Sequence, residues 1–172
     1  PTLTRRAQFY IDHDWFLEAR EELPVHKPNP RQGGDYPLTL TSGHSRWTVH
    51  STNVVNRRML ETHQGRPSVV LSPEDAYRRG IGDGDGVRVF NDVSSLVAAA
   101  KLSPSVRPGQ VIIYNGWEPY QFREWSDPAC IEPGMVKWLH LAGGYGHLRY
   151  WLMQCQPVPI DRGIAVDVAK AD

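Results

Sequence analysis

The sequence predicts a mainly β domain with short helices, folded as a small closed barrel. The chain has 172 residues, of which 40% are hydrophobic, so it is long enough to bury one core. From residue 36 onward, short apolar runs are bounded by Gly, Pro, Asp and Ser, as is typical of strands joined by turns. The connections are irregular, whereas a doubly wound parallel sheet alternates strands with long helices.

The expected strands follow the apolar runs in order. They cover residues 37–41, 68–71, 87–90, 96–102, 110–114 and 163–168. After the second run, Ser72 offers an N-cap, Pro73 suits the first helical position and Gly80 suits the left-handed stop, which together predict a helix of about two turns. The GDGDG run at residues 82–86 lacks the later ligands of a calcium loop, so a structural turn into the third strand is favoured.

Residues 1–35 differ in character from the rest of the chain. Aromatic and charged residues at 10–16 are followed by Pro24, Pro28, Pro30 and a Gly-Gly pair, and this composition prevents long regular elements. We expect residues 1–35 to be a connecting arm from an upstream domain and residues 36–172 to form the barrel. Whether the chain is a fragment or a separate subunit stays open.

The overall composition excludes several classes of function. Lys plus Arg and Asp plus Glu each total 19, so the chain has no general basic field that would attract nucleic acid or an anionic membrane. No apolar run approaches the roughly 20 residues of a membrane helix. We therefore expect neither a nucleic-acid partner nor direct membrane insertion, and any anion site must be local.

Cysteines and histidines give no metal signature. Cys130 and Cys155 are too few for a disulfide framework and lack CxxC spacing, so both are interpreted as structural thiols, with a disulfide between them left open. His44 with His50, and His140 with His147, have no accompanying cysteine pair or H-x3-5-H spacing. We expect no metal held by this chain alone.

The segment HSRWTVHS, residues 44–51, is the strongest local candidate for an anion site. An extended chain would place His44, Arg46 and His50 on one side. A helix is expected to start at Ser51 or Thr52, where free backbone N–H groups favour the oxygens of an anion such as phosphate. That helix would turn an apolar set inward: Val54, Val55, Met59 and Leu60.

This segment has two other interpretations. A surface loop followed by an ordinary capped helix would use the same residue types and stays open. Gly43, His44 and Ser45 begin like the nucleophile elbow of hydrolases, but Trp47 occupies the position at which that strained turn needs glycine. A nucleophilic serine is therefore rejected.

Two further segments carry glycine beside polar and aromatic residues. Lys137 and His140 precede a GGYG run at residues 143–146, which is followed by His147. Tyr-Asn-Gly-Trp at residues 114–117 follows the fifth expected strand. Glycine permits close backbone approach to a ligand, and aromatic rings can stack on a fused ring system. A glycine turn packed by aromatic side chains is the alternative at both places.

Taken together in order, these segments resemble a known family. The elements are residues 36–41, 44–52, 71–90, 106–109 and 143–145. They are similar to the C-terminal dinucleotide-binding domain of molybdopterin oxidoreductases of the dimethyl sulfoxide reductase superfamily. Residues 9–16, 36–52 and 143–150 look closest to the branch that contains membrane-type nitrate reductase and ethylbenzene dehydrogenase. Residues 132–140 lean toward the ethylbenzene dehydrogenase group.

The resemblance implies a fold, a cofactor and a set of contacts. The fold is a six-stranded double-psi β-barrel, and the cofactor is bis-molybdopterin guanine dinucleotide, with molybdenum held by residues outside this chain. His44 and His50 would donate to pterin-side atoms, and Asn115 would meet a guanine or pterin edge. The remaining contacts fall into three groups: Arg46, Ser51 and Thr52 on phosphate or pterin oxygens; Ser45 and Trp47 elsewhere in the same loop; and Lys137, Tyr145 and His147 on a closing wall.

The resemblance also implies a larger enzyme. We expect upstream domains of the same catalytic subunit, an iron-sulfur cluster in the missing part, an iron-sulfur electron-transfer subunit and a periplasmic location. The whole enzyme would be a hydrocarbon dehydrogenase or hydroxylase, or an oxyanion reductase, and the isolated chain is expected to be inactive. Two alternatives remain: a free-standing double-psi barrel enzyme, and a non-catalytic interaction module. A self-processing decarboxylase needs a Gly-Ser cleavage pair, which this sequence lacks.

Overall fold

The computed structural model describes residues 5–18, 20, 22–26, 32–46, 48–61, 65–132 and 162–171. The chain divides into two compact units, and residues 5–26 belong to the first. Their regular element is the short helix α1 (Asp14–Glu18), which opens where the His13 carbonyl accepts hydrogen bonds from the amides of Phe16 and Leu17. The described residues from 32 onward belong to the second unit.

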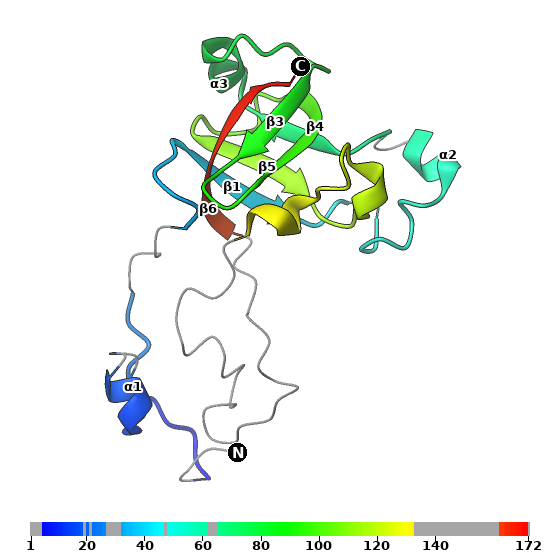
Figure 1. Ribbon diagram of the computed structural model, residues 1–172. Helices are drawn as coiled ribbons and strands as arrows, with labels where there is room; N and C mark the ends of the chain where they lie inside the picture. The colour runs from blue at the N-terminus through cyan, green and yellow to red at the C-terminus, as the bar shows by residue number, and fades with distance from the viewer. Residues whose placement is uncertain are drawn as a thin grey trace. The chain divides into compact units, whose positions relative to one another are not determined.

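The second unit is a closed β-barrel (Figure 1). Its strands are β1 (Leu38–Gly43), β2 (Ser68–Leu71), β3 (Gly86–Phe90), β4 (Ser95–Leu102), β5 (Gln110–Tyr114) and β6 (Arg162–Lys170). Their order around the barrel is β1-β5-β2-β4-β3-β6. The β1/β5 and β2/β4 pairs are parallel, and the other four are antiparallel. All six predicted strands are present, and the predicted six-stranded double-psi barrel is confirmed.

The core lies inside the barrel and is built from alternate residues of the strands. In β3 and in the first half of β1, buried residues alternate with more exposed ones, as expected of strands with one face on the core. Strand β4 differs, because its residues 96–100 are all buried. The outer face of β4 is covered by a later segment, in which Arg123 forms a bridge to Val97 and the Cys130 thiol donates to the Ser95 carbonyl at 3.4 Å.

The covering segment contains two short 3-10 helices. They are η2 (Pro119–Gln121) and η3 (Pro128–Ile131). Phe122 and Ile131 anchor the segment, since both side chains are buried in the core cluster. Within the described part of the chain, no helix is long and apolar enough to cross a membrane.

Helix α3 (Pro73–Arg78) forms where the sequence predicts it. The Ser72 hydroxyl accepts from the Asp75 amide at 3.1 Å, and Gly80 adopts a φ of 65° after the last turn. The predicted turn at residues 82–86 is also present, and the Asp85 carboxylate accepts from the Gly82 amide at 2.8 Å. Local capping chemistry therefore decides this part of the fold.

The prediction that a helix starts at Ser51 or Thr52 is wrong. Residues 51–55 form turns instead, and α2 (Arg57–Met59) begins only after Asn56. The Asn56 side chain accepts hydrogen bonds from the amides of the next turn, at Arg58 and Met59, which makes it the N-cap.

The predicted inward face of that helix is wrong as well. Val54 is buried, but Val55 is 62% exposed, and Met59 and Leu60 are only half-buried. A turn does not keep the helical spacing on which the inward set depended. The 51–55 segment therefore offers no helix N-terminus to an anion.

Candidate functional site

The candidate site begins where two parallel strands end together. β1 and β5 run in register up to the pair Gly43 and Tyr114. One residue further, the Asn115 amide donates to the Gly43 carbonyl at 3.0 Å. Carboxyl ends of parallel neighbours lie at the same edge of a sheet, so the two loops that follow them leave the barrel side by side. We call residues 44–55 the histidine loop and residues 115–121 the clamp segment.

The histidine loop brings two imidazole rings together. The ring centroids of His44 and His50 lie 5.1 Å apart, with the planes at 80°, and both side chains are exposed. The prediction of an extended segment is wrong, because β1 ends at Gly43 and His50 has a left-handed φ of 48°. The chain folds back, and this reversal, not a period of two, places both rings together. Each imidazole can donate a hydrogen bond to an oxygen.

Gly116 is the point at which the clamp segment touches the histidine loop. Its φ is 97°, a conformation that L side chains rarely adopt. A Cβ atom at this position would lie 2.4 Å from the His50 carbonyl oxygen and 2.8 Å from the carbonyl carbon. Both observations require glycine, so the backbones of the two segments are in direct contact here.

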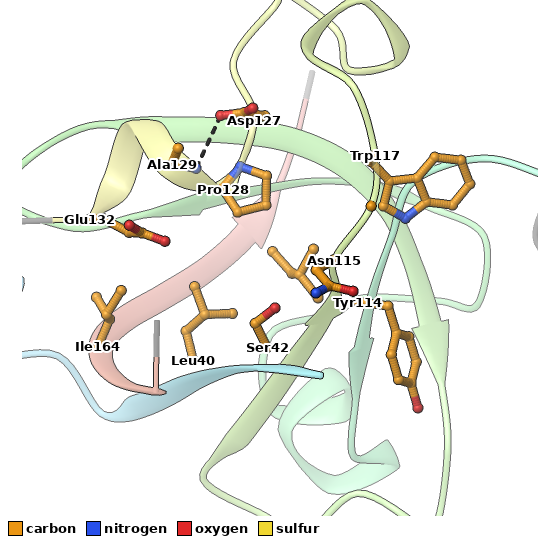
Figure 2. Close-up of a pocket in the computed structure, with 12 residues that line it drawn as sticks. Leu40, Ser42, Tyr114, Asn115, Trp117, Asp127, Pro128, Ala129, Glu132 and Ile164 are labelled. Atoms are coloured by element: carbon orange, nitrogen blue, oxygen red, sulfur yellow. Dashed lines mark hydrogen bonds between the residues drawn. The ribbon is translucent and has the colours of Figure 1, made fainter. Parts of the chain in front are cut away.

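A cavity of about 190 Å³ lies beside this contact (Figure 2). It is lined by Leu40, Ser42, Ile113, Tyr114, Asn115, Gly116, Trp117, Asp127, Pro128, Ala129, Glu132 and Ile164. Pockets for whole drug-sized ligands measure about 300–1,000 Å³, so this cavity suits one ring system of a larger molecule. Trp117 offers an aromatic face and Asn115 an amide with both donors and an acceptor.

Two carboxylates line the same cavity, and sequence reasoning missed both. Asp127 caps η3 by accepting from the Ala129 amide at 3.0 Å, as the dashed line in Figure 2 marks. The Glu132 carboxylate, the Ser42 hydroxyl and the Asn115 amide lie around the same space in Figure 2. The Asp-Pro pair at residues 127–128 is a helix-start signal that would have located the first carboxylate. Carboxylates accept hydrogen bonds, so the cavity favours a ligand edge rich in N–H groups.

The other predicted contacts of the histidine loop have mixed positions. Ser45 is half-buried and Arg46 is exposed, and both interact with other groups of the protein. Ser51 is half-buried and Thr52 is exposed. The Thr48 hydroxyl oxygen, which was not predicted, is buried and has no hydrogen-bond partner within the described part of the protein. The loop thus holds a buried polar atom that a bound ligand can satisfy.

Four of the predicted site residues lie outside the described residues: Trp47, Lys137, Tyr145 and His147. The same holds for Cys155, whereas Cys130 is a half-buried free thiol. Among the residues that the structure does describe, no group of three His, Cys, Asp or Glu side chains is placed to hold a metal ion.

A second hollow, of about 520 Å³, is a weaker candidate for an anion site. It is lined by residues near α3, including Asp75, Arg79 and Asp167. The Arg79 guanidinium donates to the Asp167 carboxylate at 2.8 Å and lies 3.7 Å from the Asp75 carboxylate. This arginine is therefore already neutralised by two acids, and the hollow offers no excess positive charge.

Comparison with known proteins shows which family the chain resembles. The molydopterin dinucleotide binding domain family matches residues 38–135. The chain is 42% identical over 176 residues to the respiratory nitrate reductase subunit alpha of Haloferax mediterranei, and 38% identical over 174 residues to the chlorate reductase subunit alpha of Ideonella dechloratans. Each alignment covers 99% of this chain but only 18% and 19% of those relatives, so the chain spans about a fifth of their length.

A solved structure agrees with the fold. Acetylene hydratase from Pelobacter acetylenicus superposes with a TM-score of 0.58 at 18% sequence identity, covering 92% of this chain and 23% of that one. At this identity the likeness concerns the fold. The family match over residues 38–135 includes strands β1 to β5 of the barrel. The chain therefore belongs to the molydopterin dinucleotide binding domain family, within the dimethyl sulfoxide reductase superfamily.

Proposed function

We propose that the chain is the cofactor-capping domain of a molybdenum oxidoreductase catalytic subunit and that it binds bis-molybdopterin guanine dinucleotide. One observation carries the proposal: a pair of imidazoles and an acid-lined cavity meet at one edge of the barrel. A pterin dinucleotide has phosphate and carbonyl oxygens that need donors, and bicyclic rings with N–H groups that need acceptors. The site supplies both kinds of group side by side.

The donor side of the fit is the histidine loop. His44 and His50 present ring N–H groups from neighbouring positions, and the buried Thr48 hydroxyl lies in the same loop. We assign these groups to phosphate or pterin oxygens. We assign the same role to Arg46, Ser51 and the other predicted contacts of the loop, and for these residues the support is the family resemblance alone.

The acceptor side of the fit is the cavity. Glu132 and Asp127 supply carboxylate oxygens, and the Asn115 amide supplies an acceptor beside donors. We assign this side to the N–H edge of a pterin or guanine ring, with the Trp117 indole as a stacking surface. When bound, the cofactor supplies the electron-transfer chemistry, while this chain binds and orients it.

The function of the whole protein is part of the proposal. The two relatives named above are a nitrate reductase and a chlorate reductase, which supports oxyanion reduction, and a 35% identical relative is the dimethylsulfide dehydrogenase subunit alpha of Rhodovulum sulfidophilum. A hydrocarbon dehydrogenase remains the other candidate. All three relatives are named as alpha subunits, which supports further subunits; we propose an iron-sulfur electron-transfer partner and a periplasmic location.

Isothermal titration calorimetry of the full chain with guanosine diphosphate tests the binding assignment. Guanosine diphosphate should bind more tightly than adenosine diphosphate, because adenine has no N1–H and no 2-amino group for the acidic cavity. His50→Ala should weaken binding about tenfold, the loss of one hydrogen bond to a charged group. Asn115→Ala should reduce the preference for guanine.

Arg78→Ala is the matched control, since Arg78 is an exposed arginine on α3 and is outside the proposed site. Its affinity for guanosine diphosphate should equal that of the unmodified chain. Equal affinity for the two nucleotides, or no binding of either, would contradict the proposed site.

A further inference from the structure

We propose that Gly116 and Gln121 are positioning residues: from the clamp segment, they hold the histidine loop at the spacing at which its two imidazoles meet a ligand together. The role of the imidazoles in binding rests on the proposed function. The contact between the two segments is seen in the structure itself and does not depend on the proposed function. Neither residue bonds to the ligand itself in this proposal.

The first contact is steric and lies at His50. Gly116 approaches the His50 backbone so closely that a Cβ atom would lie 2.4 Å from its carbonyl oxygen. A methyl group at residue 116 must therefore displace one of the two backbones, and a shift of either one changes the position of His50 relative to the clamp segment. Because the His50 ring lies 5.1 Å from the His44 ring, moving the backbone of one partner changes the arrangement of the pair.

The second contact is a hydrogen bond at the far end of the loop. The Gln121 side-chain amide donates to the Val54 carbonyl at 2.9 Å. Its oxygen accepts from the Glu118 amide at 2.9 Å, so both ends of the Gln121 side chain are used. The Val54 side chain is buried, and Gln121 thus holds the point at which the loop re-enters the packed part of the domain.

Hydrogen bonds within the histidine loop do not by themselves place it on the barrel. The Thr52 amide donates to the Val49 carbonyl at 3.1 Å, and the Val54 amide donates to the Ser51 carbonyl at 3.3 Å. Each of these bonds joins residues only three apart in the chain. Such bonds shape turns, whereas the contacts at Gly116 and Gln121 join the loop to a segment more than sixty residues away.

The consequence for binding follows from the directionality of hydrogen bonds. A group held by two donors needs both at their correct positions, and supporting contacts outside the first layer maintain those positions. Displacing one imidazole removes about one charge-assisted hydrogen bond, which corresponds to a loss of roughly tenfold in affinity. The clamp segment should therefore affect affinity without contacting the phosphates.

Two variants and two matched controls test the proposal in the full chain. Gly116→Ala introduces the steric contact with His50. Its control is Gly109→Ala, because Gly109 has a similar φ of 84° but open space around its Cβ position. Gln121→Glu removes the donor to Val54. Its control is Gln110→Glu. Gln110 begins β5, and its side-chain amide donates at 3.0 Å to the hydroxyl of Thr41 in β1, away from the histidine loop.

The first readout is the imidazole resonances of His44 and His50, measured by two-dimensional NMR without ligand. Gly116→Ala and Gln121→Glu should each shift the signals of the pair, and Gly109→Ala and Gln110→Glu should leave them in place. Thermal unfolding followed by circular dichroism confirms that each variant is folded. Unchanged imidazole signals in a folded Gly116→Ala variant and a folded Gln121→Glu variant would overturn the proposal.

The second readout is the affinity for guanosine diphosphate. Both clamp variants should bind it about tenfold more weakly than the two controls. If the unmodified chain binds it and the clamp variants bind equally well, the positioning role is wrong while the proposed function stands. If the unmodified chain does not bind it but the imidazole signals shift as expected, the proposed function fails and the geometric contact is supported.

Discussion

The most informative stability prediction concerns Asp75, which joins three parts of the barrel. Its carboxylate is buried and accepts from the Ser72 hydroxyl at 2.7 Å and from the Gly109 amide at 2.8 Å. It also lies 3.7 Å from the guanidinium of Arg79, which pairs with Asp167 of β6. Asp75 thereby connects α3 to the turn before β5 and, through Arg79, to β6.

The magnitude follows from what Asp75→Ala leaves behind. The Ser72 hydroxyl, which is 2% exposed, and the Gly109 amide both lose their acceptor. An unsatisfied buried polar group costs about 1–3 kcal/mol; the Ser72 hydroxyl is buried and the Gly109 amide is partly buried, so together they should lower the free energy of unfolding by about 3 kcal/mol. For a chain of this size, that loss lowers Tm by roughly 6–12 °C. The Ser72 hydroxyl and the Gly109 amide both donate to the same oxygen of Asp75, Oδ2, so Asp75→Asn can keep both bonds and loses only the charge that faces Arg79; it should therefore cost clearly less than Asp75→Ala.

The assay is urea unfolding of the full chain, followed by circular dichroism. Glu74→Ala is the control, because Glu74 makes an exposed ion pair with Arg78 on the same helix and should cost no more than about 0.5 kcal/mol. A loss below about 1 kcal/mol for Asp75→Ala, or a loss equal to that of the control, would refute the claim that this carboxylate joins the three parts.

Two further predictions concern protonation. Hydrogen bonding from the Gly82 amide, and next the Lys170 ammonium at 2.9 Å, lower the pKa of Asp85. The stabilisation by this carboxylate is therefore present above the unfolded pKa of about 3.9 and is lost as pH falls through the lower folded pKa. The difference in Tm between the unmodified chain and Asp85→Asn should be constant above about pH 5 and should vanish in acid; a difference independent of pH would contradict this. Burial raises the pKa of the Cys130 thiol, so less of the reactive thiolate is present at pH 8. In a Cys155→Ser variant, iodoacetamide should therefore modify Cys130 more slowly than it modifies a cysteine in an unfolded peptide. Equal rates would be evidence against the raised pKa.

The strands and one helix could be predicted from local sequence. Each of the six predicted runs contains or overlaps an observed strand, because β-branched runs between turn residues favour strands wherever they pack. Helix α3 was predicted for the same kind of reason, since Ser72 and Gly80 satisfy its ends within a few residues of sequence.

The start of α2 shows where local reasoning failed. Ser51, Thr52 and Asn56 are all acceptable N-caps by residue type, and local propensity does not choose among them. The structure selects Asn56, and the preceding residues 51–55 form turns in which the Val54 carbonyl accepts a hydrogen bond from Gln121, in another part of the chain.

Part of the candidate site could likewise be predicted from the sequence, and part could not. The residue pattern pointed to His44 and His50 as donors to an anionic ligand, whereas the role of Asn115 followed only from the family resemblance, and all three stay predictions. Sequence could not show that Gly116 touches His50, or that Asp127 and Glu132 line a cavity with Asn115. Those neighbours are created by the parallel pairing of β1 with β5 and by the covering of β4. Both are contacts between residues far apart in the chain, and no local periodicity encodes them.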